Sequence, residues 1–181
     1  MVEFDLPFER SYWADPGKLL AGYYPGDADE ATAQAKLQAL LDSGVRHVVN
    51  LMKEMNAPTG DDLVPYHDQL MSIARDSGID VTYSLLPVPD QDIPTRETMK
   101  SILDDIDRAI GEGRPVYVQC MGGIGRTGTV VGCYLSRHGM AVGDKAIDHI
   151  RELRSKDPFS HVRSPNTDPQ RGMVRSWQEG E

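Results

Sequence analysis

The chain has 181 residues, of which 39% are hydrophobic, enough to bury one sizeable core but not two. Its formal net charge of −9 at pH 7 argues against a nucleic-acid partner and against an anionic membrane surface. We therefore expect a single domain over residues 1–181, in which any attraction for an anion belongs to a local site.

Short apolar runs alternate with amphipathic stretches along the chain. This pattern is typical of an α/β domain with a central, mainly parallel sheet flanked by helices. The predicted strands are residues 18–21, 45–51, 81–88 and 115–119. Helices are predicted over residues 30–42 and 61–76, because each stretch runs into a glycine, Gly44 or Gly78, that suits a helix C-terminus.

The second half of the chain is predicted to be mostly helical. Thr95 is the expected N-cap of a helix whose apolar residues recur at helical spacing until Gly111 and Gly113. Further helices are predicted over residues 126–138, 142–154 and 169–177. Residues 53–65, rich in Asn, Pro, Gly and Asp, are expected to form a loop near the strand ends.

The first five residues contain neither a basic segment nor a continuous apolar one, and no run approaches the roughly 18 apolar residues of a membrane span. The chain has two cysteines, Cys120 and Cys133. We expect a cytoplasmic protein with reduced thiols and no membrane partner. Cys133 falls on an apolar helical stretch and is predicted to be a core residue, with a redox partnership with Cys120 as the alternative. The histidines lack metal-ligand spacing, so no metal site is expected.

A glycine-rich loop links the strand 115–119 to the helix 126–138. It reads Cys120-Met121-Gly122-Gly123-Ile124-Gly125-Arg126-Thr127. The glycines let backbone N–H groups turn inward, and such a concave row of amides at a helix N-terminus binds a dianion. The same field, with Arg126 beside it, favours the thiolate of Cys120. Arg126 can hold two phosphate oxygens at once, and Thr127 places a hydroxyl near the sulfur.

These residues resemble the Cys-x5-Arg-Ser/Thr signature of the cysteine-dependent protein tyrosine and dual-specificity phosphatases. The resemblance implies that Cys120 attacks a phosphoryl group to form a phosphocysteine while Arg126 binds the phosphoryl oxygens. The cradle would be completed by the amides of Met121, Gly122, Gly123, Ile124, Gly125 and Arg126. It also implies a phosphorylated protein or peptide as substrate, mainly phosphotyrosine with some phosphoserine or phosphothreonine, and no metal or organic cofactor.

Two more segments take part in the resemblance. Expelling the leaving group needs a proton donor, and Asp90 matches a general-acid loop in which an Asp lies four residues before a Pro. Asp92 is the alternative acid. Gln170 matches a Thr-x-x-Gln element that positions the water for hydrolysis of the phosphocysteine, although the same residues would also suit an ordinary helix start.

Gln119 is a departure from the family pattern, which has His before the cysteine. Since that His helps to keep the cysteine ionised, we expect a less activated thiol, though not an inert one. A phosphate-recognition module with little activity is therefore the alternative function. A nucleotide-binding loop and a sulfur-transfer enzyme are further alternatives, but the loop lacks the Lys-Ser/Thr pair of a nucleotide-binding P-loop. Because residues 121–125 are uncharged, we expect protein substrates in preference to polyanionic ones.

Overall fold

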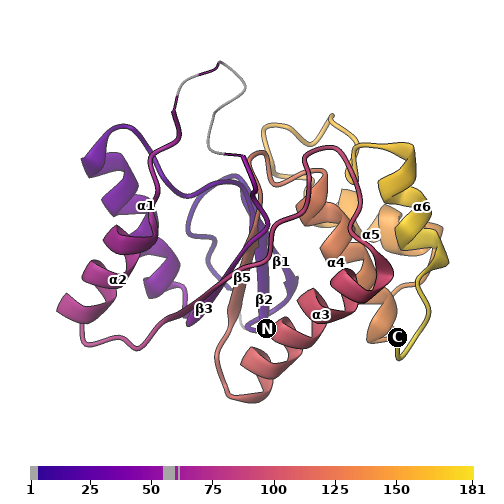
Figure 1. Ribbon diagram of the computed structural model, residues 1–181, viewed down its shortest axis with the longest axis horizontal. Helices are drawn as coiled ribbons and strands as arrows, with labels where there is room; N and C mark the ends of the chain where they lie inside the picture. The colour runs from indigo at the N-terminus through magenta and orange to yellow at the C-terminus, as the bar shows by residue number, and fades with distance from the viewer. Residues whose placement is uncertain (1–3, 55–59, 61) are drawn as a thin grey trace.

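The computed structural model describes residues 4–54, 60 and 62–181, which form one α/β domain (Figure 1). Its five-stranded sheet has the order β1-β2-β5-β3-β4. The strands are β1 (Ser11–Asp15), β2 (Leu19–Gly22), β3 (His47–Asn50), β4 (Thr82–Leu85) and β5 (Val116–Gln119). β1 runs antiparallel to β2, whereas β2, β5, β3 and β4 run parallel to one another. These four strands therefore all end at the same edge of the sheet.

Helices cover both faces of the sheet (Figure 1). One face carries α1 (Glu30–Asp42) and α2 (His67–Asp76). The other carries α3 (Arg96–Gly111), α4 (Arg126–Arg137), α5 (Asp144–Leu153) and α6 (Asp168–Ser176). This three-layer arrangement confirms the fold class expected from the sequence.

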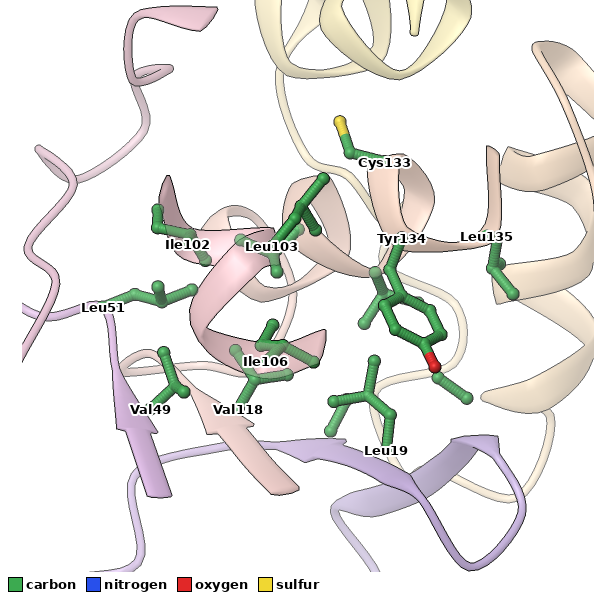
Figure 2. Close-up of a cluster of buried hydrophobic side chains, with 14 of the residues drawn as sticks. Leu19, Val49, Leu51, Ile102, Leu103, Ile106, Val118, Cys133, Tyr134 and Leu135 are labelled. Carbon is green, nitrogen blue, oxygen red and sulfur yellow. The ribbon is translucent and has the colours of Figure 1, made fainter. Parts of the chain in front are cut away.

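The two sides of the central strands supply two separate cores. Val49 and Val118 pack toward α3 and α4, together with Leu103 and Leu135 (Figure 2). Their neighbours Val48 and Tyr117 enter the core formed with α1 and α2. Because successive strand residues point to opposite faces, a central strand covered on both sides reads as a continuous apolar run. Full burial of one such side chain contributes roughly 1.5–3 kcal/mol.

The predicted strands are all present, three of them with shorter bounds and the strand at residues 18–21 shifted by one residue to β2, but β1 was not predicted. Its sequence includes the polar residues Ser11 and Asp15, so it does not read as an apolar run although all five residues are buried. Both side chains find partners inside the protein: Ser11 Oγ donates to the Phe8 carbonyl at 2.6 Å, and Asp15 Oδ2 accepts from Tyr134 Oη at 3.0 Å. Buried polar groups are tolerated when they are hydrogen-bonded in this way.

The predicted start of the second helix at residue 61 is wrong, since α2 begins at His67. Pro65 explains the shift, because a proline has no N–H to donate and drives the residue before it toward extended backbone. Residue 61 itself lies outside the described residues, as do residues 55–59 of the predicted loop. Among the residues that are described, no helix is both long and apolar enough to cross a bilayer.

Candidate active site

The glycine-rich loop forms a cup at the edge of the sheet where the parallel strands end. Cys120 follows β5 directly, in the middle of the sheet, and α4 begins at Arg126. The cup opens into a cavity of ≈ 220 Å³ lined by Asp90, Gln91, Cys120, Met121, Gly122, Ile124, Gly125, Arg126, Val162, Asn166 and Gln170. The structure therefore brings Asp90 and Gln170, which are distant in sequence, to the same cavity as Cys120 and Arg126.

Cys120 lies at the floor of the cup. Its side chain is buried, with the residue 2% exposed, and its sulfur accepts a hydrogen bond from Thr127 Oγ1 at 3.0 Å. Thr127 sits in the first turn of α4, so the N-terminal end of that helix lies beside the sulfur of Cys120. A helix N-terminus and a donated hydrogen bond both stabilise negative charge on sulfur.

Glycine is required in the cup for steric reasons. Gly123 has a φ of +69°, and a Cβ there would lie 2.5 Å from the carbonyl carbon of Gly22 at the end of β2. The outer side of the cup is held by two further bonds. The amide of Tyr24 donates to the Met121 carbonyl at 3.2 Å, and Arg10 Nη2 donates to the Gly122 carbonyl at 2.9 Å. These contacts fix the cup against the sheet before any ligand binds.

Arg126 is buried beside Cys120 and is held by acceptors on two loops. Nη1 donates to Glu54 Oε2 at 2.7 Å and to the Val88 carbonyl at 3.3 Å, while Nη2 bonds Glu54 Oε1 and lies 3.1 Å from Asp90 Oδ1. Burial opposes its charge, but the Glu54 hydrogen bonds and the neighbouring acidic groups raise the pKa of Arg126. Its Nε is buried and has no partner among the described residues. That donor suits a phosphate oxygen.

Glu54 is a site residue that sequence reasoning missed. It lies shortly after the end of β3, the strand beside β5, and within the stretch predicted only as a loop. The sequence signal for it was an acidic residue shortly after the carboxyl end of a predicted strand, because parallel strands bring their ends together. That this strand lies next to the one that carries Cys120 is seen only in the structure.

Asp90 and Asp92 have different surroundings. Asp90 lines the cavity and contacts Arg126, with its side chain 59% exposed. Asp92 Oδ1 instead accepts from the amide of Ile93 at 2.8 Å. The geometry therefore places Asp90 at the site, whereas the carboxylate of Asp92 stabilises its own turn.

Gln170 lies at the site and at a helix start, the two positions that the sequence had offered as alternatives. It lines the cavity, and it also forms a capping box at the start of α6 with Thr167, whose amide donates to Gln170 Oε1 at 3.1 Å. Its Nε2 donates to the Asp92 carbonyl at 3.3 Å and so ties α6 to the acid loop. The side chain is therefore rigidly placed beside the cup.

Gln119 is fully buried at the end of β5 and faces the layer of α1 and α2. Its Nε2 donates to Tyr66 Oη at 2.8 Å, and its Oε1 has no partner in the described part of the chain. Burial raises the pKa of Tyr66, so that hydroxyl stays protonated. Cys120 belongs to the core on the opposite side of the sheet, so the side chains of Gln119 and Cys120 point to opposite faces.

Cys133 and His47 take structural positions. Cys133 is completely buried in the core beside α3, as predicted (Figure 2), and burial raises the pKa of its thiol. His47 is buried and bonded to Asp105 at 2.8 Å and to Thr82 at 2.7 Å. Within the described ranges, no group of three or more His, Cys, Asp or Glu side chains is arranged to hold a metal ion.

Comparison with known proteins agrees with this geometry. A family model described as PTP-SAK, "Swiss Army Knife protein, DSP-PTPase phosphatase domain", matches residues 9–171. An uncharacterised protein of Methanocaldococcus jannaschii is 40% identical over 67 residues, which are 37% of this chain and 44% of that protein. The match thus spans less than half the length of that relative.

Solved structures share the fold over nearly the whole chain. The crystal structure of Tk-PTP in the active form gives a TM-score of 0.64 at 22% identity, covering 93% of this chain and 96% of that one. PTPMT1 in complex with PI(5)P gives a TM-score of 0.64 at 20% identity, covering 93% and 94%. At sequence identities of 22% and 20%, these two comparisons establish that the chains share a fold.

Proposed function

The chain belongs to the dual-specificity and tyrosine phosphatase superfamily, through the DSP-PTPase domain family that matches it, and from that membership we propose that it hydrolyses phosphotyrosine in proteins. Phosphoserine and phosphothreonine are further substrates in this proposal. The observation that carries it is the meeting of Cys120, Arg126 and Asp90 in one cavity. A nucleophile, a phosphate clamp and a proton donor are the groups that this reaction needs.

In the first step the thiolate of Cys120 attacks phosphorus, and the bond from phosphorus to the tyrosine oxygen breaks. Asp90 gives its proton to that oxygen, so the leaving group departs as a neutral phenol. Arg126 and the amides of the cup bind the phosphoryl oxygens, where negative charge is spread in the transition state. The product is a phosphocysteine and a dephosphorylated side chain.

In the second step water attacks the phosphocysteine and Asp90 takes a proton from it. The sulfur–phosphorus bond breaks, inorganic phosphate forms, and Cys120 leaves as a thiolate. The hydroxyl of Thr127, 3.0 Å from the sulfur, stabilises that thiolate. Gln170, held rigidly beside the cup, is the residue we assign to orient the water.

Two features support a protein substrate. Residues 121–125 of the cup carry no charge, so the site itself offers one clamp for one phosphate. The molecule as a whole has a net charge of −9, which repels strongly anionic ligands and membrane surfaces.

The test is hydrolysis of an aryl phosphate and of a phosphotyrosine peptide with EDTA present. We expect turnover by the native chain, none by Cys120→Ser, and near-native turnover by Cys133→Ala, which removes the other thiol. Cys120→Ser should still bind phosphate, since the cup and Arg126 remain. Binding of a phosphopeptide without turnover by the native chain would instead establish a recognition module. Residual turnover above a few per cent in Cys120→Ser would exclude Cys120 as the nucleophile.

A further inference from the structure

Arg10 contacts the cup from outside, at the open end of the β1–β2 hairpin. It precedes β1 directly, and the amide of Tyr23, just after β2, donates to its carbonyl at 3.3 Å. The register of β2 with β5 pairs Gly22 with Gln119, so this end of the hairpin lies beside the cup. There Arg10 Nη2 donates to the Gly122 carbonyl at 2.9 Å, although the two residues are 112 positions apart.

Two aromatic rings fix the guanidinium of Arg10. It lies 4.4 Å from the ring centroid of Tyr23 and 4.4 Å from that of Phe159. Both distances are within the roughly 6 Å over which a cation is attracted to an aromatic face. Phe159 is itself anchored, since its amide donates to Asp157 Oδ1 at 2.8 Å and its carbonyl accepts from Arg154 Nη2 at 3.1 Å. The guanidinium is therefore held in place against the cup.

The charge of Arg10 is not balanced by a carboxylate. Within the described ranges, no ion pair joins its guanidinium to an acidic side chain, and its Nε is buried without a hydrogen-bond partner. Arg126 differs, because Glu54 and Asp90 both lie against it. Arg10 therefore places an uncompensated positive charge behind the cup, in a chain whose net charge is −9.

The peptide unit between Gly122 and Gly123 connects this charge to the inside of the cup. The unit is trans, so it is planar and its C=O and N–H point in opposite directions. Gly122 lines the cavity, and its carbonyl points away from the cavity to Arg10. The N–H of Gly123 therefore points to the inner side of the cup. Hydrogen bonds in series polarise one another, so a cation at the carbonyl makes this N–H a stronger donor.

We propose that Arg10 is a positioning residue of the cup, whose charge acts through the Gly122–Gly123 peptide unit to strengthen the binding of a dianion above Cys120. This inference rests on the proposed function, because the dianion is the phosphoryl group that a phosphatase binds. It also gives the β1–β2 hairpin a part in the site, since the hairpin carries Arg10 and Tyr23 to the cup.

The test measures binding of tungstate, a tetrahedral dianion that resembles phosphate, to the full chain at pH 7. Arg10→Gln keeps a neutral donor and removes the charge. It should raise the Kd for tungstate about tenfold, because a charge-assisted hydrogen bond is roughly twice as strong as a neutral one. The NMR signal of the Gly123 amide proton should move upfield in the same variant. Arg10→Lys returns a charge and should bring the Kd to within about threefold of the native value.

Arg46→Gln is the matched control for the loss of a buried guanidinium contact. Arg46 Nη1 donates to the carbonyls of Leu41 at 2.9 Å and Val45 at 2.7 Å, just before β3 and so at the opposite edge of the sheet from the cup. Its replacement removes the same charge and the same kind of bond. We expect the Kd for tungstate and the Gly123 signal to stay at their native values.

Phe159→Leu tests the same link without changing Arg10. Phe159 is 41% exposed, so the chain should fold normally. The variant removes one of the two rings that hold the guanidinium and should raise the Kd for tungstate about threefold. In the Arg10→Gln background the same change should have no effect, because the charge that the ring positions is already gone.

The possible outcomes separate this inference from the proposed function. A native Kd in Arg10→Gln, or equal losses in Arg10→Gln and Arg10→Lys, would reduce Arg10 to a packing contact and overturn the inference. Tungstate binding that depends on Arg10, in a native chain that hydrolyses no phosphate ester, would exclude the proposed phosphatase and leave the inference in place. Phosphatase activity that Arg10→Gln leaves unchanged would do the reverse.

Discussion

Glu54 and Arg126 form a two-pronged ion pair beside Cys120, in which both carboxylate oxygens meet the two terminal nitrogens of the guanidinium. Burial alone would raise the pKa of Glu54, but the hydrogen bonds from Arg126 and from backbone amides, together with the positive charge of Arg126, lower that pKa below its usual range. The carboxylate therefore stays ionised at neutral pH and orients the guanidinium so that Nε is left for the substrate.

Glu54→Gln should lower kcat/KM about tenfold, or about 1.4 kcal/mol of transition-state stabilisation, because an amide cannot accept from both terminal nitrogens. Because the pKa of Glu54 lies below that of an ordinary carboxyl group, Glu54 stays ionised and paired with Arg126 at neutral pH. The pair is lost only when the pH falls through this lowered pKa. The measurement is kcat/KM on a phosphotyrosine peptide at pH 7. Glu112→Gln, at the opposite edge of the sheet, is the matched control. A rise in kcat/KM would mean that Glu54 competes with the phosphate.

The sequence predicted the cup but not this pair. Cys120, the glycines and Arg126 are close in sequence, so their local conformation and chemistry could be predicted together. Glu54 and Arg126 are 72 positions apart and meet only because β3 and β5 are neighbours in the sheet. Strand order depends on long-range packing, which residue spacing does not reveal, and the same limit concealed β1 with its buried polar residues.

Asp90→Asn should slow the dephosphorylation of phosphotyrosine by about 100-fold or more, the usual contribution of a general acid. An aryl phosphate with a good leaving group should lose much less, because it needs no proton in the transition state. The alkaline limb of the kcat profile should flatten as well. Asp92→Asn is the control, since its carboxylate bonds the Ile93 amide and faces its own turn. If Asp92→Asn shows this pattern and Asp90→Asn does not, the acid is Asp92.

The two thiols should react very differently with iodoacetamide at pH 7.5. Burial raises the pKa of Cys133, so its thiol stays protonated and inert, whereas Cys120 lines an open cavity beside a helix N-terminus. We expect one alkyl group per native chain, located on Cys120 by peptide mass mapping. Vanadate should protect Cys120, and two groups should appear after unfolding. Alkylation of Cys133 in the native chain would contradict its place in the core.

Tyr66→Phe should lower the free energy of unfolding by about 1–2 kcal/mol, because it leaves the buried amide of Gln119 without its partner. Thermal denaturation measures this loss. Tyr83→Phe removes a hydroxyl from a half-buried neighbour that bonds Asn50, and serves as the comparison. If Tyr66→Phe is as stable as the native chain, the hydrogen bond to Gln119 does not help to hold the strand that carries Cys120.

Gln119→His tests whether the neutral amide leaves Cys120 less activated. An imidazole at this position can donate to Tyr66 Oη as Gln119 does, and its partial positive charge lies one residue from the sulfur. The acidic limb of kcat/KM should therefore move to lower pH, with the largest gain in rate below neutrality, and alkylation by iodoacetate should shift in the same direction. Adding Tyr66→Phe should reverse part of the shift, because it removes the acceptor that holds the ring. If the limb stays in place or moves to higher pH, the cup amides, Thr127 and Arg126 set the ionisation of Cys120 without help from residue 119.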